Sequence, residues 1–148
     1  MHDIGIVIVN WNTCDYLEKC LQTVYASEGD FSYQVVVVDN NSDDASAKMV
    51  HDNFPQADLI VNEENIGYPR ANNVGLRFLG YHAENKVDVD APRYALLLNP
   101  DTELPSTALY EMIKFMDSRP DVGVAGPKLI LNDGSLDKAC RRGFPTPM

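Results

Sequence analysis

Polar side chains stand just after three short apolar segments of the chain. Asn10 and Asn12 follow the first segment, Asp39 follows the second, and Asp101 comes three residues after the third. Carboxylate and amide oxygens are ligands of hard divalent cations, and such a cation offsets the charge of a bound anion. If the fold brings these groups together, they could bind a divalent cation with an anionic ligand.

The three apolar segments are predicted to be β-strands. They span residues 4–9, 35–38 and 94–98, and their side chains are apolar at odd and even positions alike. This pattern is typical of strands that are covered on both faces, so we expect the segment 95–98 to be buried. A further short strand is predicted at 59–61.

Helical patterns alternate with these strands. The first expected helix has its apolar residues at the 3.6-residue period: Leu17, Cys20, Leu21, Val24 and Tyr25. Asn12 or Thr13 is expected to cap this helix. A second helix is expected from a cap at Ser42 to about Asn53, and a third from about Pro69 to about Tyr81. A fourth helix is expected from a cap at Ser106 to its end at Pro120.

The remaining segments have weaker patterns. Residues 83–92 are polar and charged, which predicts an exposed loop. Residues 122–125 and 128–131 are strand candidates, and the Asn132-Asp133-Gly134 sequence predicts a hairpin turn.

Alternating strands and helices predict an α/β fold with an open, mostly parallel sheet flanked by helices. Ligands of such sheets bind outside the carboxyl ends of the strands. Asn10, Asp39 and Asp101 all follow strands, so we expect them at one edge of the sheet.

Composition limits the classes of partner. The 148 residues suit one compact domain, and the net charge of -10 argues against nucleic acid as a ligand. Three cysteines without a C-x-x-C pair predict neither a disulfide framework nor a structural zinc site, which suits a cytoplasmic compartment. No apolar run is long enough for a transmembrane segment and no signal peptide is evident, so we expect a soluble chain.

Three common phosphate-binding classes fit poorly. The dinucleotide-binding motif G-x-G-x-x-G should follow the first strand, where the chain has VNWNTCDYL instead, and a P-loop is missing there as well. A phosphoacceptor receiver domain would need an acidic pair where Asn10-Trp11-Asn12 stands. We expect Trp11 to pack near the edge of the site rather than to stack on a ligand.

Four ordered segments resemble the family 2 glycosyltransferases with a GT-A fold, especially their rhamnosyltransferase-like branch. The segments are IVIVNWN at 6–12, VVVVDNNSDD at 35–44, NEENIGYPRANNVGL at 62–76 and LLLNPDTEL at 96–104. VGVAGPKLI at 122–130 and the following DGS turn extend the resemblance. It implies a Rossmann-like GT-A sheet and a nucleotide-diphospho-sugar as substrate, either a UDP- or a dTDP-sugar.

The resemblance also implies roles for particular residues. Asp39 is expected to bind the base or ribose, with Asn10 near the same nucleoside. Asp101 matches the last acid of the family's D-x-D motif and is expected to ligate Mg²⁺ or Mn²⁺, which stabilises the charge of the leaving diphosphate. Asn99 stands at the place of the first acid, which weakens the expected cation site. The other residues expected to bind substrate are Asn12, Asn41, Asn65, Gly67, Arg70 and Asn73.

By resemblance, the enzyme would transfer a sugar with inversion to a hydroxyl of a glycan or lipid-linked acceptor, in cell-surface polysaccharide or lipid-linked glycan synthesis. Its general base is expected beyond Met148, so residues 1–148 would be a truncated donor-binding domain with little or no activity, peripheral at the inner face of the membrane in the full-length protein. The alternative is a non-catalytic or phosphate-signalling α/β module that binds nucleotide or Mg²⁺. Titration with nucleoside diphosphates discriminates between the two.

Overall fold

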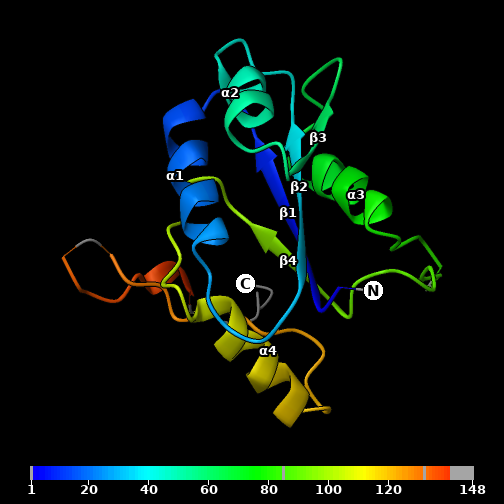
Figure 1. Cartoon of the computed structure of the whole chain (residues 1–148), viewed down its shortest axis with the longest axis vertical. Coiled ribbons are helices and arrows are strands. Elements are labelled where there is room, and N and C mark those ends of the chain that lie inside the picture. The colour runs from blue at the N-terminus through cyan, green and yellow to red at the C-terminus, as the bar shows by residue number, and fades with distance from the viewer. Residues whose placement is uncertain (1, 85, 132, 141–148) are drawn as a thin grey trace, which may run out of the picture. The chain divides into compact units, whose positions relative to one another are not determined.

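The computed structural model describes residues 2–84, 86–131 and 133–140 (Figure 1). The chain divides into two compact units, residues 1–113 and 114–148, and the boundary falls within a helix. The first unit holds the sheet and the candidate site, so the two units are described separately.

The first unit contains a four-stranded sheet in which all strands are parallel. Its strands are β1 (Ile4–Asn10), β2 (Tyr33–Asp39), β3 (Asp58–Val61) and β4 (Tyr94–Leu98), in the spatial order β3-β2-β1-β4. The register pairs Asn10 with Asp39 at the carboxyl ends of the two central strands. The prediction of an open parallel sheet is confirmed, and the expected polar edge is formed.

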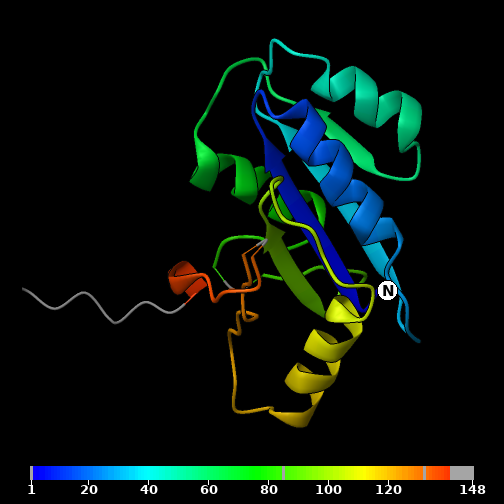
Figure 2. The same cartoon turned by 90° about the vertical axis from the view of Figure 1, so that its left-hand side faces the viewer.

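Helices cover both faces of the sheet (Figure 2). On one face lie α1 (Cys14–Tyr25), α2 (Ser46–Asn53) and the first part of α4 (Ala108–Ser118), which pack on Ile6, Ile8, Val35 and Val37. Leu17, Cys20, Leu21 and Val24 of α1 are buried there and Tyr25 is half-buried, as the apolar period predicts.

The other face is covered by α3 (Tyr68–Phe78), which packs on β1 and β2. Pro69 lies in its first turn, as predicted. The helix ends before the expected Tyr81, because Gly80 takes a φ of 92° that an α-helix cannot continue.

Strand β4 is not buried on both faces, so that prediction is wrong. It is an edge strand that pairs with β1, and its Leu97 side chain is 47 % exposed. Leu97 is in register with Val7 and therefore lies on the α3 face of the sheet, but α3 covers β1 and β2 instead. A run of apolar residues is thus compatible with an edge strand that has one covered face.

The packing of α3 on the sheet depends on Gly75. A Cβ atom at this position would lie 2.4 Å from Cγ1 of Val7, which is fully buried. We expect Gly75→Ala to lower the free energy of unfolding by about 1–3 kcal/mol, the usual cost of overpacking a core. Urea unfolding measures this change, and Gly123→Ala is the control because its Cβ would meet nothing within 4 Å. A stabilised Gly75→Ala variant would contradict the close packing.

The predicted helix caps are confirmed in one place and wrong in two. Thr13 occupies the cap position of α1, as expected, but makes no side-chain cap hydrogen bond, and its hydroxyl donates to Asn10 Oδ1. Helix α2 begins at Ser46, so Ala45 rather than Ser42 occupies its cap position, and the Ser42 hydroxyl donates to Asp39. Helix α4 begins at Ala108, two residues after Ser106.

The loop before β4 is exposed over the described residues from 83 to 90, as predicted, but its last two positions are not. Ala91 and Pro92 are buried, and the carbonyl of Pro92 accepts a hydrogen bond from the Tyr81 hydroxyl. In the part of the chain that the structure describes, no helix is both long and apolar enough to cross a membrane.

The second unit, described by itself, has little regular structure. It holds the end of α4 and a short 3-10 helix, Lys138–Cys140. The expected strand at 122–125 is absent from the described residues, and that at 128–131 is reduced to one antiparallel bridge between Ile130 and Leu136. The Gly134 N–H donates to the carbonyl of Leu131, which closes a turn, while Asn132 lies outside the described residues.

Candidate functional site

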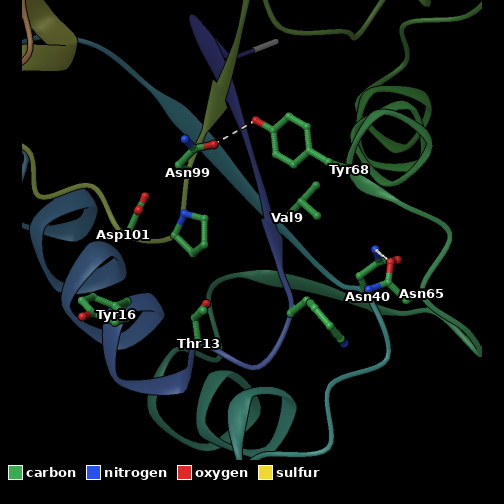
Figure 3. A pocket seen from close by; sticks show the side chains of 10 residues that line it. Val9, Thr13, Tyr16, Asn40, Asn65, Tyr68, Asn99 and Asp101 are labelled. Atoms are coloured by element: carbon green, nitrogen blue, oxygen red, sulfur yellow. Dashed lines mark hydrogen bonds between the residues drawn. The ribbon is translucent and has the colours of Figure 1, made fainter. Parts of the chain in front are cut away.

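A pocket of about 480 Å³ lies at the carboxyl ends of the strands (Figure 3). It is lined by Val9, Trp11, Thr13, Tyr16, Asn40, Asn65, Tyr68, Asn99, Pro100 and Asp101. The residues come from the end of β1, from α1, from the start of α3 and from the segments that follow β1, β2, β3 and β4. All of them belong to the first unit of the chain.

The structure brings three of the predicted site residues into this lining: Asn65, Asn99 and Asp101. Asp101 is exposed and brings a carboxylate to the pocket, close to the backbone turn made by Asn99 and Pro100 (Figure 3). The sequence-based prediction that an acid would stand beyond the carboxyl end of β4 is therefore correct in position.

Two contacts with α1 hold the segment that carries Asp101. The Cys20 thiol donates to the carbonyl of Asn99 at 3.7 Å, and the Leu104 N–H donates to Thr23 Oγ1 at 3.0 Å. Burial, and then the negative charge of Asp101, raise the pKa of Cys20 to about 12. The thiol therefore stays protonated at neutral pH and keeps its role as a donor.

Asn10 and Asp39 lie at the carboxyl ends of their strands but do not line the pocket. Both are buried, and Asn10 Nδ2 donates to Asp39 Oδ1 at 3.0 Å. Asp39 also accepts from the backbone N–H of Ser42 at 2.9 Å and from its hydroxyl at 2.7 Å. Thr13, which does line the pocket, donates to Asn10 Oδ1 at 2.6 Å. The pair therefore supports the loops that carry lining residues.

Asn12 and Asn41 lie on the same two loops, outside the lining, and both have a positive φ. Asn12 Oδ1 accepts from the backbone N–H of Asp43 at 2.7 Å, and its own N–H donates to the Ser42 hydroxyl at 2.9 Å. These contacts tie the loop after β1 to the loop after β2.

The neighbour of Asn41 lines the pocket in its place. Asn40 is 2 % exposed, and its Nδ2 donates to Asn65 Oδ1 at 2.6 Å. Its own Oδ1 accepts from Asn62 Nδ2 at 3.0 Å and from the Ile66 N–H at 3.1 Å. Asn40 thus fixes the loop after β3 against the end of β2, a role that the sequence analysis did not predict, since it named Asn41 instead.

Gly67 has a positive φ of 81° at the residue before α3, and it does not line the pocket. Arg70 and Asn73 are exposed on α3 and do not line the pocket. Neither side chain would contact a ligand bound in this pocket, and their expected role in substrate binding stays a prediction.

The sequence-based reasoning missed several aromatic and hydroxyl residues of the lining. Trp11 is 55 % exposed and lines the pocket, so it is not the packing residue that we expected. Tyr68 lines the pocket from the start of α3, and its hydroxyl donates to Asn99 Oδ1 at 3.0 Å. The signal available for Tyr68 was its place directly after Gly67 in the segment 62–76.

The pocket offers oxygen ligands for a cation, but few of them. Among the described residues, no group of three or more histidine, cysteine, aspartate or glutamate side chains could hold a metal ion. Asp101 supplies a carboxylate of the type that Mg²⁺ and Mn²⁺ prefer. The residues therefore fit a cation whose other ligands are water and the phosphates of a bound molecule.

The parallel sheet and the pocket at its carboxyl ends define an α/β protein with a candidate ligand site at the edge where open α/β sheets bind ligands. The family model described as "Glycosyl transferase family 2" matches residues 5–142, and the chain belongs to this family.

A curated relative is an N-acetylglucosaminyl-diphospho-decaprenol L-rhamnosyltransferase from Mycobacterium tuberculosis, strain H37Rv. It is 25 % identical over 140 residues, which are 94 % of this chain and 45 % of the relative. The same figures hold for the protein of a second strain of this species. The chain therefore spans less than half the length of these curated relatives.

Solved structures confirm the fold. S. aureus TarS 1-349 in complex with UDP-GlcNAc superposes with a TM-score of 0.62 at 23 % identity. The superposed part is 80 % of this chain and 32 % of the TarS chain. The mannosyltransferase PcManGT from Pyrobaculum calidifontis, in complex with GDP-Man and Mn²⁺, superposes with a TM-score of 0.58 at 22 % identity over 78 % of this chain and 32 % of its own.

Proposed function

We propose that this chain is the donor-binding portion of a glycosyltransferase that binds a nucleotide-diphospho-sugar with Mg²⁺ or Mn²⁺. The observation that carries the proposal is the pocket at the strand ends, where the carboxylate of Asp101 stands with the amides of Asn65 and Asn99 in a family 2 chain. The complete enzyme would transfer the sugar with inversion to a hydroxyl group of an acceptor.

The charge of the chain supports a role for the cation. The net charge is -10, and the lining of the pocket contains a carboxylate but no lysine or arginine. A diphosphate would be repelled by Asp101 unless a cation stood between them. The cation would neutralise the charge that grows on the diphosphate as the bond to the sugar breaks.

The arrangement also suggests an orientation for the donor. We place the diphosphate beside Asp101 and Asn99, after β4, and the nucleoside toward the end of β2. There Asn40 and Asn65 line the pocket, and Asn40 directly follows Asp39, which is hydrogen-bonded to Asn10. This orientation retains the nucleoside-side role of Asp39 that the family resemblance implies.

The general base is proposed to lie outside residues 1–148. In the described lining, Asp101 is the one carboxylate, and a carboxylate that ligates the cation cannot also take the proton of the acceptor hydroxyl. The share of the curated relatives that this chain spans, 45 %, supports the same division. Alone, the chain would bind the donor and transfer the sugar weakly or not at all.

The proposed acceptor is a glycan or a lipid-linked glycan, reached from the inner face of the membrane. The support for it is the curated relative, whose name describes a rhamnosyltransferase that acts on N-acetylglucosaminyl-diphospho-decaprenol. A UDP- or dTDP-sugar is the proposed donor, since TarS is solved with UDP-GlcNAc.

The test is isothermal titration of the chain with UDP, dTDP and GDP, each in EDTA and in MnCl₂. We expect one of these nucleoside diphosphates to bind with 1:1 stoichiometry and more tightly with Mn²⁺. Inorganic phosphate and acetyl phosphate are the matched probes for a phosphate-signalling module. Binding of these two, with no binding of any nucleoside diphosphate, would overturn the proposed function.

A further inference from the structure

A hydrogen bond joins two parts of the pocket that are far apart in sequence. The hydroxyl of Tyr68, at the start of α3, donates to Asn99 Oδ1, just after β4, at 3.0 Å (Figure 3). Both residues line the pocket, and Tyr68 is 46 % exposed. The bond is therefore placed where a bound ligand would meet it.

This hydrogen bond fixes which end of the Asn99 amide is turned toward Tyr68 and which end is turned away from it. An amide has an oxygen that accepts and a nitrogen that donates two hydrogen bonds. Because Oδ1 receives the Tyr68 hydroxyl, Nδ2 lies on the side away from that ring (Figure 3). The Tyr68 hydroxyl occupies one of the two lone-pair positions of Oδ1, and its hydrogen carries a partial positive charge that disfavours a cation beside it.

We propose that Tyr68 is a positioning residue that turns the Asn99 amide so that its N–H groups donate to the phosphate oxygens of the bound nucleotide. Asp101 is then the one ligand that this segment gives to the cation. The inference rests on the proposed function, because it assigns a role to a residue within that same donor site. It explains how an asparagine serves at position 99: its N–H groups attract an anion without the charge that an aspartate would add.

The test uses UDP as the probe, or whichever nucleoside diphosphate the unaltered chain binds most tightly. We expect Tyr68→Phe to weaken binding about threefold to tenfold in EDTA, the usual effect of one hydrogen bond. Asn99→Ala should have a similar or larger effect. The double variant should bind like Asn99→Ala alone, because the hydroxyl acts through the amide.

Metal dependence separates this role from a merely structural one. The ratio of affinities with and without Mn²⁺ should stay the same in Tyr68→Phe, since Asp101 is untouched. Asn99→Asp should bind UDP more weakly in EDTA and show a larger gain with Mn²⁺, because a second carboxylate repels the anion but ligates the cation. The matched control is Tyr81→Phe, which removes a hydroxyl that donates to the Pro92 carbonyl away from the pocket lining.

The inference would be overturned if Tyr68→Phe left the affinity for UDP unchanged. It would also be overturned if Tyr68→Phe lowered this affinity by the same factor in the unaltered chain and in Asn99→Ala. A Tyr68→Phe variant whose Mn²⁺ gain disappears would also overturn it, since Asn99 Oδ1 would then be a cation ligand. The proposed function fails separately, when the unaltered chain binds none of the nucleoside diphosphates; the inference then fails with it. Thermal unfolding of each variant shows whether a loss of binding reflects a loss of folding.

Discussion

Replacement of Asp101 with alanine should weaken the binding of a nucleoside diphosphate in MnCl₂ by roughly tenfold to a thousandfold, because the cation loses its carboxylate ligand. The opposite change is expected in EDTA. There Asp101 faces the diphosphate without an intervening cation, so removal of its charge should leave affinity unchanged or raise it. Isothermal titration under the two conditions measures both effects.

Asp90→Ala is the control for this variant. Asp90 is an exposed carboxylate of the loop before β4 and lies outside the pocket lining, so its removal changes the net charge by the same amount. Affinity in MnCl₂ that is the same in Asp101→Ala and Asp90→Ala would rule out Asp101 as the metal ligand.

Replacement of Asp39 with alanine should have two effects of comparable size. Asp39 is 1 % exposed and accepts hydrogen bonds from Asn10 Nδ2 and from the N–H and hydroxyl of Ser42. Leaving these donors unpaired should lower the free energy of unfolding by about 3 kcal/mol. Affinity for a nucleoside diphosphate should fall by about 1–3 kcal/mol, while affinity for pyrophosphate should change little.

Urea unfolding and parallel titrations with UDP and pyrophosphate measure these effects. Asp39→Asn is the milder companion variant, because it keeps an oxygen that can accept from Ser42 and retains the shape of the side chain. Equal losses for UDP and pyrophosphate would show that Asp39 acts on the phosphates, or only on the turn, and would contradict its assignment to the nucleoside.

The central strands and their helices could be predicted from the sequence because their signals are local and their environment is uniform. β1 and β2 are apolar at every position from Ile6 to Val9 and from Val35 to Val38, and both strands are buried on both faces. The apolar residues that recur along α1 pack into the same core as these strands. Sequence and packing therefore require the same structure in this part of the chain.

The prediction failed where the environment is not uniform. Leu97 lies between two leucines, as a residue of a buried strand would lie between apolar residues. Its side chain is nevertheless 47 % exposed, because β4 is at the edge of the sheet. Val124 was assigned to a strand but is 92 % exposed, and no strand pairs with its segment among the described residues. Strand pairing and helix placement are tertiary properties that a local apolar pattern does not contain.

In the site, the sequence placed residues on the correct edge but did not show which side chains reach the pocket. Asp101 was found because it follows a strand, and Asn65 and Asn99 were found because they lie in segments that resemble the family. Asn40 was missed in favour of its neighbour Asn41, which has a φ of 64° and does not line the pocket. The residue types of a turn do not by themselves determine which of its side chains lines a pocket.

The hydrogen bonds of Ser42 have a consequence for the thermodynamics of ligand binding. Its hydroxyl joins Asp39 at the end of β2 to the backbone of Asn12 after β1, and both loops carry lining residues. These hydrogen bonds join groups of the chain itself, so we expect the entropy of ordering the two loops to be lost during folding rather than on binding. Preorganisation of this kind leaves residues of the lining, such as Trp11 and Tyr16, open to exchange for other side chains while the scaffold beneath them is kept. Donor preference could then change by substitution at the pocket surface without a matching loss of stability.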